Sequence, residues 1–413
     1  MAPLFLPLTL LVTLLLTRIT SSAPLDVVED VSKRADAVYA NSISSCPAVA
    51  ARSSPPTSVH DLRPDDFSYT MALGDSITAS AFSRGIQNNT LLSFSEWRGE
   101  SYAAGMDAGA ITIPNLIKNY KPSLTGGSLG SNPTIELCFG PLCPIGPFGW
   151  NSRVDQLNAA QSGALATNLY HEVNDYLIPQ VKARNIPASA YKYLNLQIGS
   201  NDICSMCFQS VLGFGPASPD DFEASIRKTL EAVRNGIPNT VVNVIGVFKV
   251  SDVYTVRQSL TQDHPVIPNP LPDDVKPTIL FSTAPIPHAN IECPCMLLGG
   301  SVGDTTRALM DKLMNQYNER LVKIVKEYQQ KRYSNFAVLW QPPNIPLASY
   351  PVQALSSVDC FHPSTKTHRF IATQVWNRLV GTADERAATF TWSEALSFRC
   401  LQESDRIRTD TLL

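Results

Sequence analysis

The stretch Phe67-Ser-Tyr-Thr-Met-Ala-Leu-Gly-Asp-Ser-Ile-Thr78 decides the fold that we expect for this chain. Its first seven residues are mostly apolar, which is typical of a buried β-strand, and Gly74 ends the run. Ser76 follows, in front of a segment that we expect to open a helix. In an open α/β sheet, ligands bind at the carboxyl ends of the strands. The stretch therefore predicts an α/β fold with Ser76 at a cleft, although the pentapeptide at 74–78 alone fits a helix-capping turn equally well.

Working outward, strand-like and helix-like segments alternate along the chain. Apolar runs predict three further strands, at residues 191–198, 240–248 and 335–341. Apolar residues at helical spacing predict helices at residues 161–182, 219–235, 304–331 and 365–379. Asp304 is the expected N-cap of the third of these helices. The alternation predicts βαβ crossovers and one doubly wound parallel sheet that helices cover on both faces.

The composition indicates a globular protein and argues against a nucleic-acid partner. The 413 residues include 33 Lys and Arg against 36 Asp and Glu, which gives a formal net charge of −3. A nucleic-acid binder needs a basic face that displaces counterions. The hydrophobic share of 44% is enough for a large core.

The N-terminal residues are those expected of an exported protein. Residues 4–16 form an apolar run that is short for a membrane span, and small residues follow it. We expect residues 1–23 to be a secretory signal peptide, with an uncleaved membrane anchor as the alternative. Residues 24–60 are the expected N-terminal arm or linker and residues 61–382 the main domain. Residues 383–413 are expected to be a C-terminal extension, packed on the domain or partly disordered.

Nine cysteines lie beyond the apolar run, and in an exported protein we expect up to four disulfides with one cysteine left over. Two pairings would close short loops and one would join the ends of the domain: Cys138–Cys143, Cys204–Cys207 and Cys46–Cys400. The alternative for four of the cysteines is a zinc site, built from Cys204, Cys207, Cys293 and Cys295. Asn88 begins the sequon Asn88-Asn-Thr and is the predicted glycosylation site.

Three more stretches carry side chains that suit catalysis. Asn201, in Gly199-Ser-Asn-Asp202, follows a predicted strand, so that its amide could donate to a developing oxyanion. Gly163 precedes a predicted helix, where a glycine lets a main-chain N–H approach a ligand. Asp359 stands three residues before His362, so that its carboxylate can bond Nδ1 and leave Nε2 to take a proton from a serine. Each stretch alone also fits an ordinary turn, loop or surface position.

In this order the four stretches resemble the SGNH (GDSL) hydrolase superfamily. The matching blocks are GDS at 74–76, Gly163, GxND at 199–202 and DxxH at 359–362. Longer stretches resemble its phospholipase B branch, notably TSVHDLRPDDFSYTMALGDSIT at 57–78 and DCFHPSTKTH at 359–368. The likeness extends from about Cys46 to Cys400. Residues 101–107 are a looser version of the pattern of that branch.

The resemblance implies a flavodoxin-like α/β/α sandwich with a central parallel sheet. It also implies that Ser76 is the nucleophile, that His362 is the general base and that Asp359 orients it. The oxyanion hole would consist of the main-chain amides of Ser76 and Gly163 and the side chain of Asn201. The implied activity is hydrolysis of acyl esters in phospholipids and lysophospholipids through an acyl-enzyme, without a metal or cofactor. We expect a secreted monomer that contacts membrane surfaces transiently.

Alternatives remain for the site and for the function. Ser128 and Ser301 lie in G-x-S-x-G sequences, but no helix is expected after Ser128, and the run before Ser301 contains Cys-Pro-Cys. His368 is the fallback for the base. The alternative functions are an esterase for a short-chain lipid or an acetylated sugar, and a secreted lipid-binding protein without turnover.

Overall fold

The computed structural model describes residues 37–133, 135–143, 149–208, 218–258 and 293–409. The predicted signal peptide at residues 1–23 lies outside the described residues. So do the first part of the predicted arm and two of the six histidines, His264 and His288. None of the described helices is long and apolar enough to cross a membrane.

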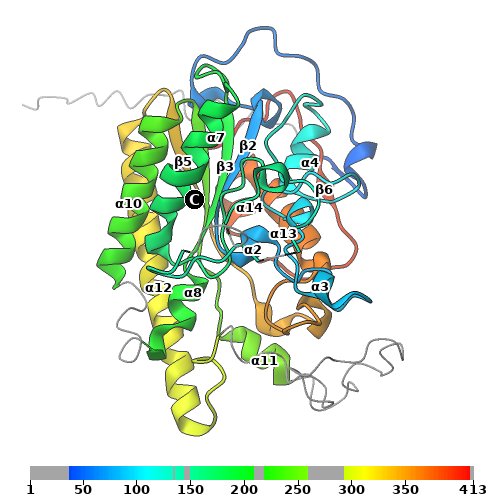
Figure 1. The fold of residues 1–413 in the computed structure, drawn as a ribbon. Helices are drawn as coiled ribbons and strands as arrows, with labels where there is room; N and C mark the ends of the chain where they lie inside the picture. Colours follow the sequence, from blue (N-terminus) through cyan, green and yellow to red (C-terminus); the bar gives the residue numbers. More distant parts are fainter. Residues whose placement is uncertain (1–36, 134, 144–148, 209–217, 259–292, 410–413) are drawn as a thin grey trace, which may run out of the picture. The chain divides into compact units, whose positions relative to one another are not determined.

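A four-stranded parallel sheet lies at the centre of the fold (Figure 1). The strands stand side by side in chain order: β2 (Tyr69–Gly74), β3 (Lys192–Gln197), β4 (Thr240–Ile245) and β5 (Phe336–Gln341). All of their residues except Tyr69 are buried, as in parallel sheets that are covered on both faces. Each strand begins within two residues of its predicted start, and the predicted α/β class is confirmed.

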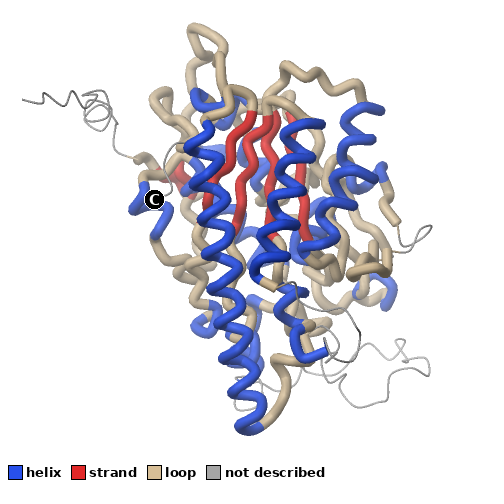
Figure 2. The backbone as a smooth tube through the Cα atoms, turned by 90° about the vertical axis from the view of Figure 1, so that its left-hand side faces the viewer, coloured by secondary structure: helices blue, strands red, loops and turns tan. Residues whose placement is uncertain are grey.

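Helices cover both faces of this sheet, which makes the fold a three-layered sandwich. One face carries α7 (Ile178–Ala183), α10 (Pro219–Gly236) and α12 (Gly300–Lys331), which pass in front of the strands in Figure 2. The other face carries α4 (Ile113–Lys118) and α13 (Thr365–Leu379) (Figure 1). The shorter helices are α2 (Ser76–Ala79), α3 (Thr90–Ser93), α5 (Ser152–Asp155), α6 (Leu169–His171), α8 (Ser200–Cys204), α11 (Asp252–Gln258) and α14 (Ala383–Ala387).

The helix predicted at 161–182 is shorter and less regular than expected. A 3₁₀ turn at Ala166–Asn168 leads into α6, a π-helical segment at Glu172–Leu177 and α7. The helix does not begin at residue 161 because the chain still runs beside β2 there, and Gly163 then turns with a φ of 82°. Pro179 has no N–H for a regular i→i−4 bond, which the wider π-helical turn before it accommodates.

The N-terminus of α12 also differs from the prediction. The helix begins at Gly300, after Gly299 as N-cap, so that Asp304 lies inside it and does not cap it. Asp304 instead pairs with Arg307, one turn further on, at 2.6 Å. Because Ser301 and Val302 are both tolerated in a helix, α12 extends in the N-terminal direction as far as Gly299 and Gly300.

Loop segments complete the hydrogen bonding of β2, which would otherwise be an edge strand of the sheet. Ala72 N donates to Leu157 O at 3.1 Å, and Gln161 N donates to Gly74 O at 3.1 Å. Residues 157–161 therefore run along the outer side of β2, where a fifth strand would stand. This pairing brings the chain around Gly163 to the end of β2 where Ser76 lies.

Four disulfides join the described residues. Cys46–Cys400 and Cys138–Cys143 are present as predicted. The predicted Cys204–Cys207 pair is wrong, because these two cysteines lie three residues apart on a helical stretch and both face the segment at 293–295. The bridges are Cys204–Cys293 and Cys207–Cys295, which also excludes the alternative zinc site. Cys360 is left over and buried.

The ends of the described chain lie together. β1 (Tyr39–Ala40) pairs with β6 (Phe398–Arg399) in a separate two-stranded antiparallel sheet. Cys46–Cys400 bonds the same two regions covalently. Leu401 and Ile407 are both buried in the core, so that residues after 383 contribute to its packing up to the end of the described chain.

Candidate active site

Ser76 stands on a tight turn between β2 and α2. Gly74 has a φ of 150°, and a Cβ at this position would lie 2.4 Å from the carbonyl oxygen of Gln197, so that only glycine fits. Asp75 caps α2, because its Oδ1 accepts the N–H of Ile77 at 2.9 Å. The turn presents Ser76, which is 6% exposed, as the first residue of the helix.

The side chains of Ser76, His362 and Asp359 form one line of hydrogen bonds. Ser76 Oγ lies 2.7 Å from His362 Nε2, and His362 Nδ1 bonds to Asp359 Oδ2. Asp359 Oδ1 accepts the main-chain N–H groups of Phe361, at 3.0 Å, and of His362, at 3.1 Å. Cys360, with a φ of 49°, lets the chain turn tightly enough for the carboxylate to reach the imidazole. The sequence spacing predicted this return of Asp359 onto Nδ1.

Hydrogen bonds hold Asp359 in its ionised form. Burial by itself would raise the pKa of this carboxyl, but the charge of His362 and the bonds from its ring and from two main-chain amides hold the pKa below its usual value. An ionised carboxylate at Nδ1 keeps the proton on that nitrogen. Nε2 is then the acceptor that faces the hydroxyl of Ser76.

Gly163 and Asn201 belong to two segments that are bonded to each other. Asn201, the second residue of α8, donates from Nδ2 to Ala164 O at 3.1 Å. Asp202 Oδ2 accepts the N–H of Ala166 at 2.9 Å. One of the two Nδ2 hydrogens of Asn201 is used in this contact, so that the other is available for a ligand. Because β2 and β3 are neighbours, α2 and α8 follow at the same edge of the sheet (Figure 1).

A buried glutamate that the sequence analysis missed bonds the turn that carries Ser76. Glu172 Oε2 accepts the N–H of Gly74 at 3.0 Å. The side chain is fully buried, and burial raises the pKa of Glu172 well above its usual value. Its burial could have been inferred from the sequence, because Glu172 lies three residues after Leu169, on the apolar stripe of the predicted helix.

The alternative serines and histidine have other surroundings. Ser128 is buried and donates to Asp155 O at 3.0 Å, and Ser301 is exposed on α12. His368 accepts the N–H of Tyr102 at its Nδ1, at 3.2 Å. Burial lowers the pKa of His368 to about 3, so that this ring stays neutral. Asn88, the predicted glycosylation site, is exposed, and its modification stays a prediction.

An apolar pocket of about 50 Å³ lies near the carboxyl ends of β3 and β4. Chain neighbours of Ser76 and His362 contribute to its wall, namely Ile77, Phe361 and Pro363. Further lining residues come from the ends of β3 and β4, from loops and from α13: Gln197, Ile245, Phe248, Leu347, Tyr350, Leu355 and Ile371. Gln197 is buried, and neither polar atom of its amide has a hydrogen-bond partner among the described residues. The wall of this pocket is thus mostly apolar.

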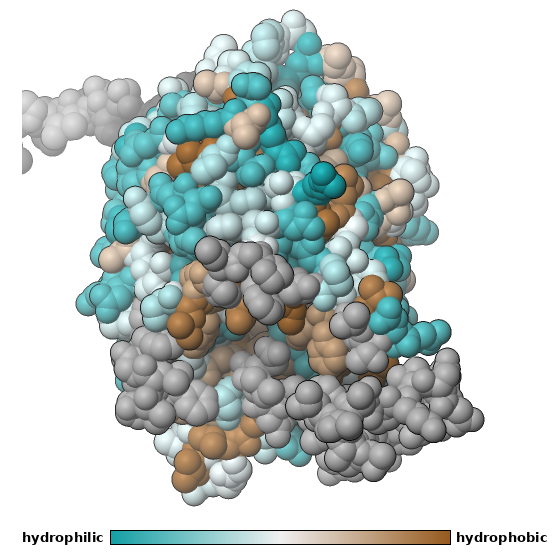
Figure 3. Space-filling view, in the orientation of Figure 1, coloured by the Kyte–Doolittle hydropathy of each residue, from teal (hydrophilic) through white to brown (hydrophobic). Residues whose placement is uncertain are grey.

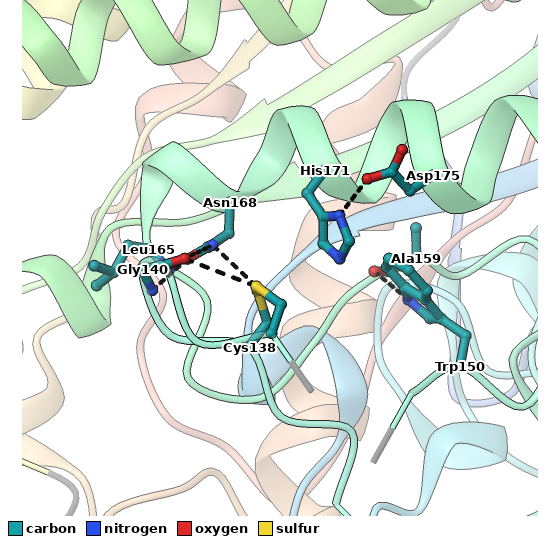
Figure 4. Close-up of a disulfide and its surroundings, with 9 residues drawn as sticks. Cys138, Gly140, Trp150, Ala159, Leu165, Asn168, His171 and Asp175 are labelled. Carbon is teal, nitrogen blue, oxygen red and sulfur yellow. Dashed lines mark hydrogen bonds and ion pairs between the residues drawn. A yellow bond between two sulfur atoms is a disulfide. The ribbon is translucent and has the colours of Figure 1, made fainter. Parts of the chain in front are cut away.

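The short disulfide loop at 138–143 packs against the segment that contains Gly163, where a Cβ would lie 3.2 Å from the carbonyl oxygen of Cys138. Cys138 N donates to Ser162 O at 3.0 Å. Figure 4 shows His171 beside this disulfide, and its ring nitrogen and the two sulfurs lie within 4.8 Å of one another. Because the sulfurs are bonded to each other, they offer no thiolates to a metal ion.

A serine that is hydrogen-bonded to a buried His–Asp pair, at the carboxyl edge of a parallel sheet, defines a serine hydrolase of α/β fold. The family model of GDSL-like lipases and acylhydrolases matches residues 71–375. The chain therefore belongs to this family and is a hydrolase of carboxylic esters.

The curated relatives are phospholipases. The chain is 26% identical over 367 residues to membrane-associated phospholipase B1 of Rattus norvegicus, and the match covers 86% of this chain and 22% of that protein. It is 25% identical over 366 residues to the protein of the same name from Homo sapiens, again with 86% of this chain and 22% of that protein. The match thus spans only about a fifth of the length of these relatives.

Solved structures with a related fold are esterases and lipases. An acetylxylan esterase of Geobacillus stearothermophilus is 14% identical, with 79% of this chain and 96% of that chain covered and a TM-score of 0.34. An extracellular lipase of Streptomyces rimosus is 12% identical, with 73% and 94% covered and a TM-score of 0.30.

Proposed function

We propose that the protein is a secreted enzyme that hydrolyses acyl esters of phospholipids and lysophospholipids through an acyl-enzyme on Ser76. The observation that supports this most strongly is the continuous line from Ser76 Oγ to His362 Nε2 and from His362 Nδ1 to Asp359. A serine hydroxyl becomes a good nucleophile when a positioned base takes its proton.

In the first half of the reaction, His362 Nε2 takes the proton of Ser76 as Oγ attacks the ester carbonyl carbon. The main-chain amides of Ser76 and Gly163 and the Asn201 side chain donate to the oxyanion, and each such donor contributes about 10²–10³ in rate. The tetrahedral intermediate then releases the alcohol, which receives the proton from His362. The acyl group remains on Ser76.

In the second half, His362 takes a proton from a water molecule as its oxygen attacks the acyl-enzyme. The second tetrahedral intermediate releases the fatty acid, and Oγ recovers its proton from His362. Asp359 stays ionised throughout and keeps the imidazole in the tautomer that accepts at Nε2. Every proton is returned, so that the cycle consumes one water per ester.

Two apolar features support a lipid substrate. The pocket to which Ile77, Phe361 and Pro363 contribute is lined mainly by aliphatic and aromatic side chains, which suit an acyl chain better than a sugar. On the face in Figure 3, brown apolar residues gather in the lower half, whereas the upper half is mainly polar. The name of the curated relatives points to the same substrate class.

The test is turnover of phosphatidylcholine and lysophosphatidylcholine vesicles or micelles, with identification of the products. Ser76→Ala should lose at least about 10³-fold in kcat, because the variant lacks the hydroxyl that carries the acyl group in this proposal. Ser301→Ala is the matched control and should keep its activity, since Ser301 is an exposed residue of α12. Full activity of Ser76→Ala would reject the proposal.

An esterase for acetylated sugars or short-chain lipids is the alternative within the same family. A series of esters with acyl chains of increasing length separates the two. The apolar pocket predicts that kcat/KM rises with chain length beyond acetyl. A maximum at acetyl would favour the alternative.

A further inference from the structure

A buried ionic cluster lies outside the line of Ser76, His362 and Asp359. Arg98 is completely buried and contacts three carboxylates, which we name together the Arg98 cluster. The closest contacts are 2.8 Å to Glu96, 3.0 Å to Glu136 and 3.3 Å to Asp155. Burial raises the pKa of Glu136, and the nearby charges of Asp155 and Glu96 act in the same direction, whereas Arg98 opposes them. Buried ion clusters carry a large desolvation cost, so that this one calls for a structural or functional reason.

The Arg98 cluster bonds directly to the residues that precede Gly163. Arg98 donates to Ala160 O at 2.7 Å and to Asn158 O at 3.4 Å. Ser162 donates from Oγ to Glu96 Oε1 at 2.5 Å. The main-chain N–H of Ser162 donates to the carbonyl oxygen of Glu136 at 2.7 Å. We call residues 158–163 the oxyanion segment.

The oxyanion segment is held from three sides. The Arg98 cluster holds one side, and β2 holds another, where Gln161 N donates to Gly74 O. Beyond Gly163, Asn201 bonds to Ala164 O and Asp202 bonds to Ala166 N. A main-chain donor has no rotamers of its own, so that its direction depends entirely on the segment that carries it. The Gly163 amide is therefore directed by these contacts.

We propose that Arg98 is a positioning residue for the oxyanion hole, which acts through Glu96 and Ser162 and through the carbonyl groups of Asn158 and Ala160. This inference rests on the proposed role of Gly163. It explains why an arginine is buried there, since a guanidinium presents several donors in a rigid plane and can bond carboxylates and carbonyl groups at once. A lysine in its place could not bond all of these groups simultaneously.

The smallest change that tests this is Ser162→Ala, which removes one hydroxyl and one bond to the cluster. We expect kcat for a soluble p-nitrophenyl ester to fall about 10-fold with KM nearly unchanged, because only the stabilisation of the transition state is weakened. Ser162→Thr keeps a hydroxyl and should recover a large part of kcat. A role in stability alone would leave kcat of the folded fraction unchanged in both variants.

Arg98→Met is the larger change, and Arg399→Met is its matched control. Arg399 is also buried and pairs with two acids, Glu385 at 3.0 Å and Asp405 at 3.1 Å, but it lies on β6 in the separate two-stranded sheet. Both variants should lose stability. Only Arg98→Met should lose kcat per folded molecule, by about 100-fold or more.

Equal kcat in Ser162→Ala and the wild type would overturn the inference, and this variant decides the matter if Arg98→Met does not fold. The soluble ester separates this inference from the proposed lipid substrate. Failure of the lipid proposal appears as absent phospholipid turnover by the wild type. Failure of the positioning role appears as unchanged kcat of the Ser162 variant on the p-nitrophenyl ester.

Discussion

Asp359 and Asp75 are both buried carboxyls beside the reactive side chains, yet the structure gives them opposite tendencies to ionise. Both oxygens of Asp359 are bonded, and its pKa lies below the usual value. Asp75 has one oxygen bonded to Ile77 N, while Oδ2 has no partner among the described residues. Burial raises the pKa of Asp75 to about 7, and the nearby charge of Asp202 acts in the same direction.

Burial alone therefore does not decide the pKa of these two carboxyls; the nearby charges and the hydrogen-bond donors around each of them contribute as well. The difference suits the proposed reaction. An ionised Asp359 is needed to orient and stabilise the imidazolium of His362. A second negative charge on Asp75 would repel the oxyanion that forms on the substrate held by Ser76. With its pKa raised to about 7, Asp75 is protonated in part of the molecules near neutral pH, which lessens that repulsion while the side chain still caps α2.

The separate roles of Asp359 and Asp75 are tested most directly by replacing each acid with its neutral isostere. Asp359→Asn should lower kcat about 10³–10⁴-fold, because the amide favours the wrong tautomer of His362. Asp75→Asn should lower kcat less than about 10-fold, since an Asn oxygen can still accept from Ile77 N. Steady-state kinetics on a soluble ester measures both effects. Equal losses in the two variants would contradict the assignment of separate roles.

A second pair, on α8, extends the comparison to the oxyanion donors. Asn201→Ala should lower kcat about 10²-fold with little change in KM, because a donor to the transition state is lost. Asp202→Asn is the control, because an Asn oxygen can still accept the N–H of Ala166 and kcat should fall less than about 10-fold. If Asp202→Asn lost more kcat than Asn201→Ala, Asp202 and not Asn201 would be the residue of α8 on which the reaction mainly depends.

The smallest expected effect concerns stability. A carboxyl with a raised folded-state pKa holds its proton more tightly in the folded chain, so that stability falls as pH rises from about 4 to about 7. Asp75→Asn lacks this loss. Relative to the wild type, the variant should gain on the order of 2 kcal/mol in unfolding free energy between pH 5 and pH 8. Urea unfolding at the two pH values measures it, and a difference independent of pH would show that Asp75 is ionised in the folded state.

Local pattern was enough to predict the sheet, and spacing was enough to predict the return of Asp359 onto His362, whereas the grouping of Ser76 with these residues was implied by the family resemblance. The four strands are short buried apolar runs, and the fold-back of Asp359 onto His362 needs only three residues of chain. The α12 start at Gly300 was not predictable from capping preference, because Asp304 is an equally good cap in sequence. The irregular helix after Gly163 depends on pairing of residues 157–161 with β2, which is a long-range contact.

Contacts between residues that are far apart in the chain could not be predicted from the sequence either. In the sequence, nothing distinguishes Arg98, Glu136 and Asp155 from ordinary surface charges. Only the fold brings them into contact. The cysteine pairs Cys204–Cys293 and Cys207–Cys295 join segments almost 90 residues apart, as their separations of 89 and 88 residues record. No rule of local spacing selects such pairs over the shorter Cys204–Cys207 loop.

The central claim is that Ser76 carries the acyl group during turnover. The most direct measurement is to label the native protein with a fluorophosphonate, digest it and locate the adduct by mass spectrometry. We predict a single adduct on the peptide that contains Ser76, and none in Ser76→Ala. An adduct on another serine, such as Ser128 or Ser301, or an unlabelled protein that still hydrolyses esters, would contradict the account.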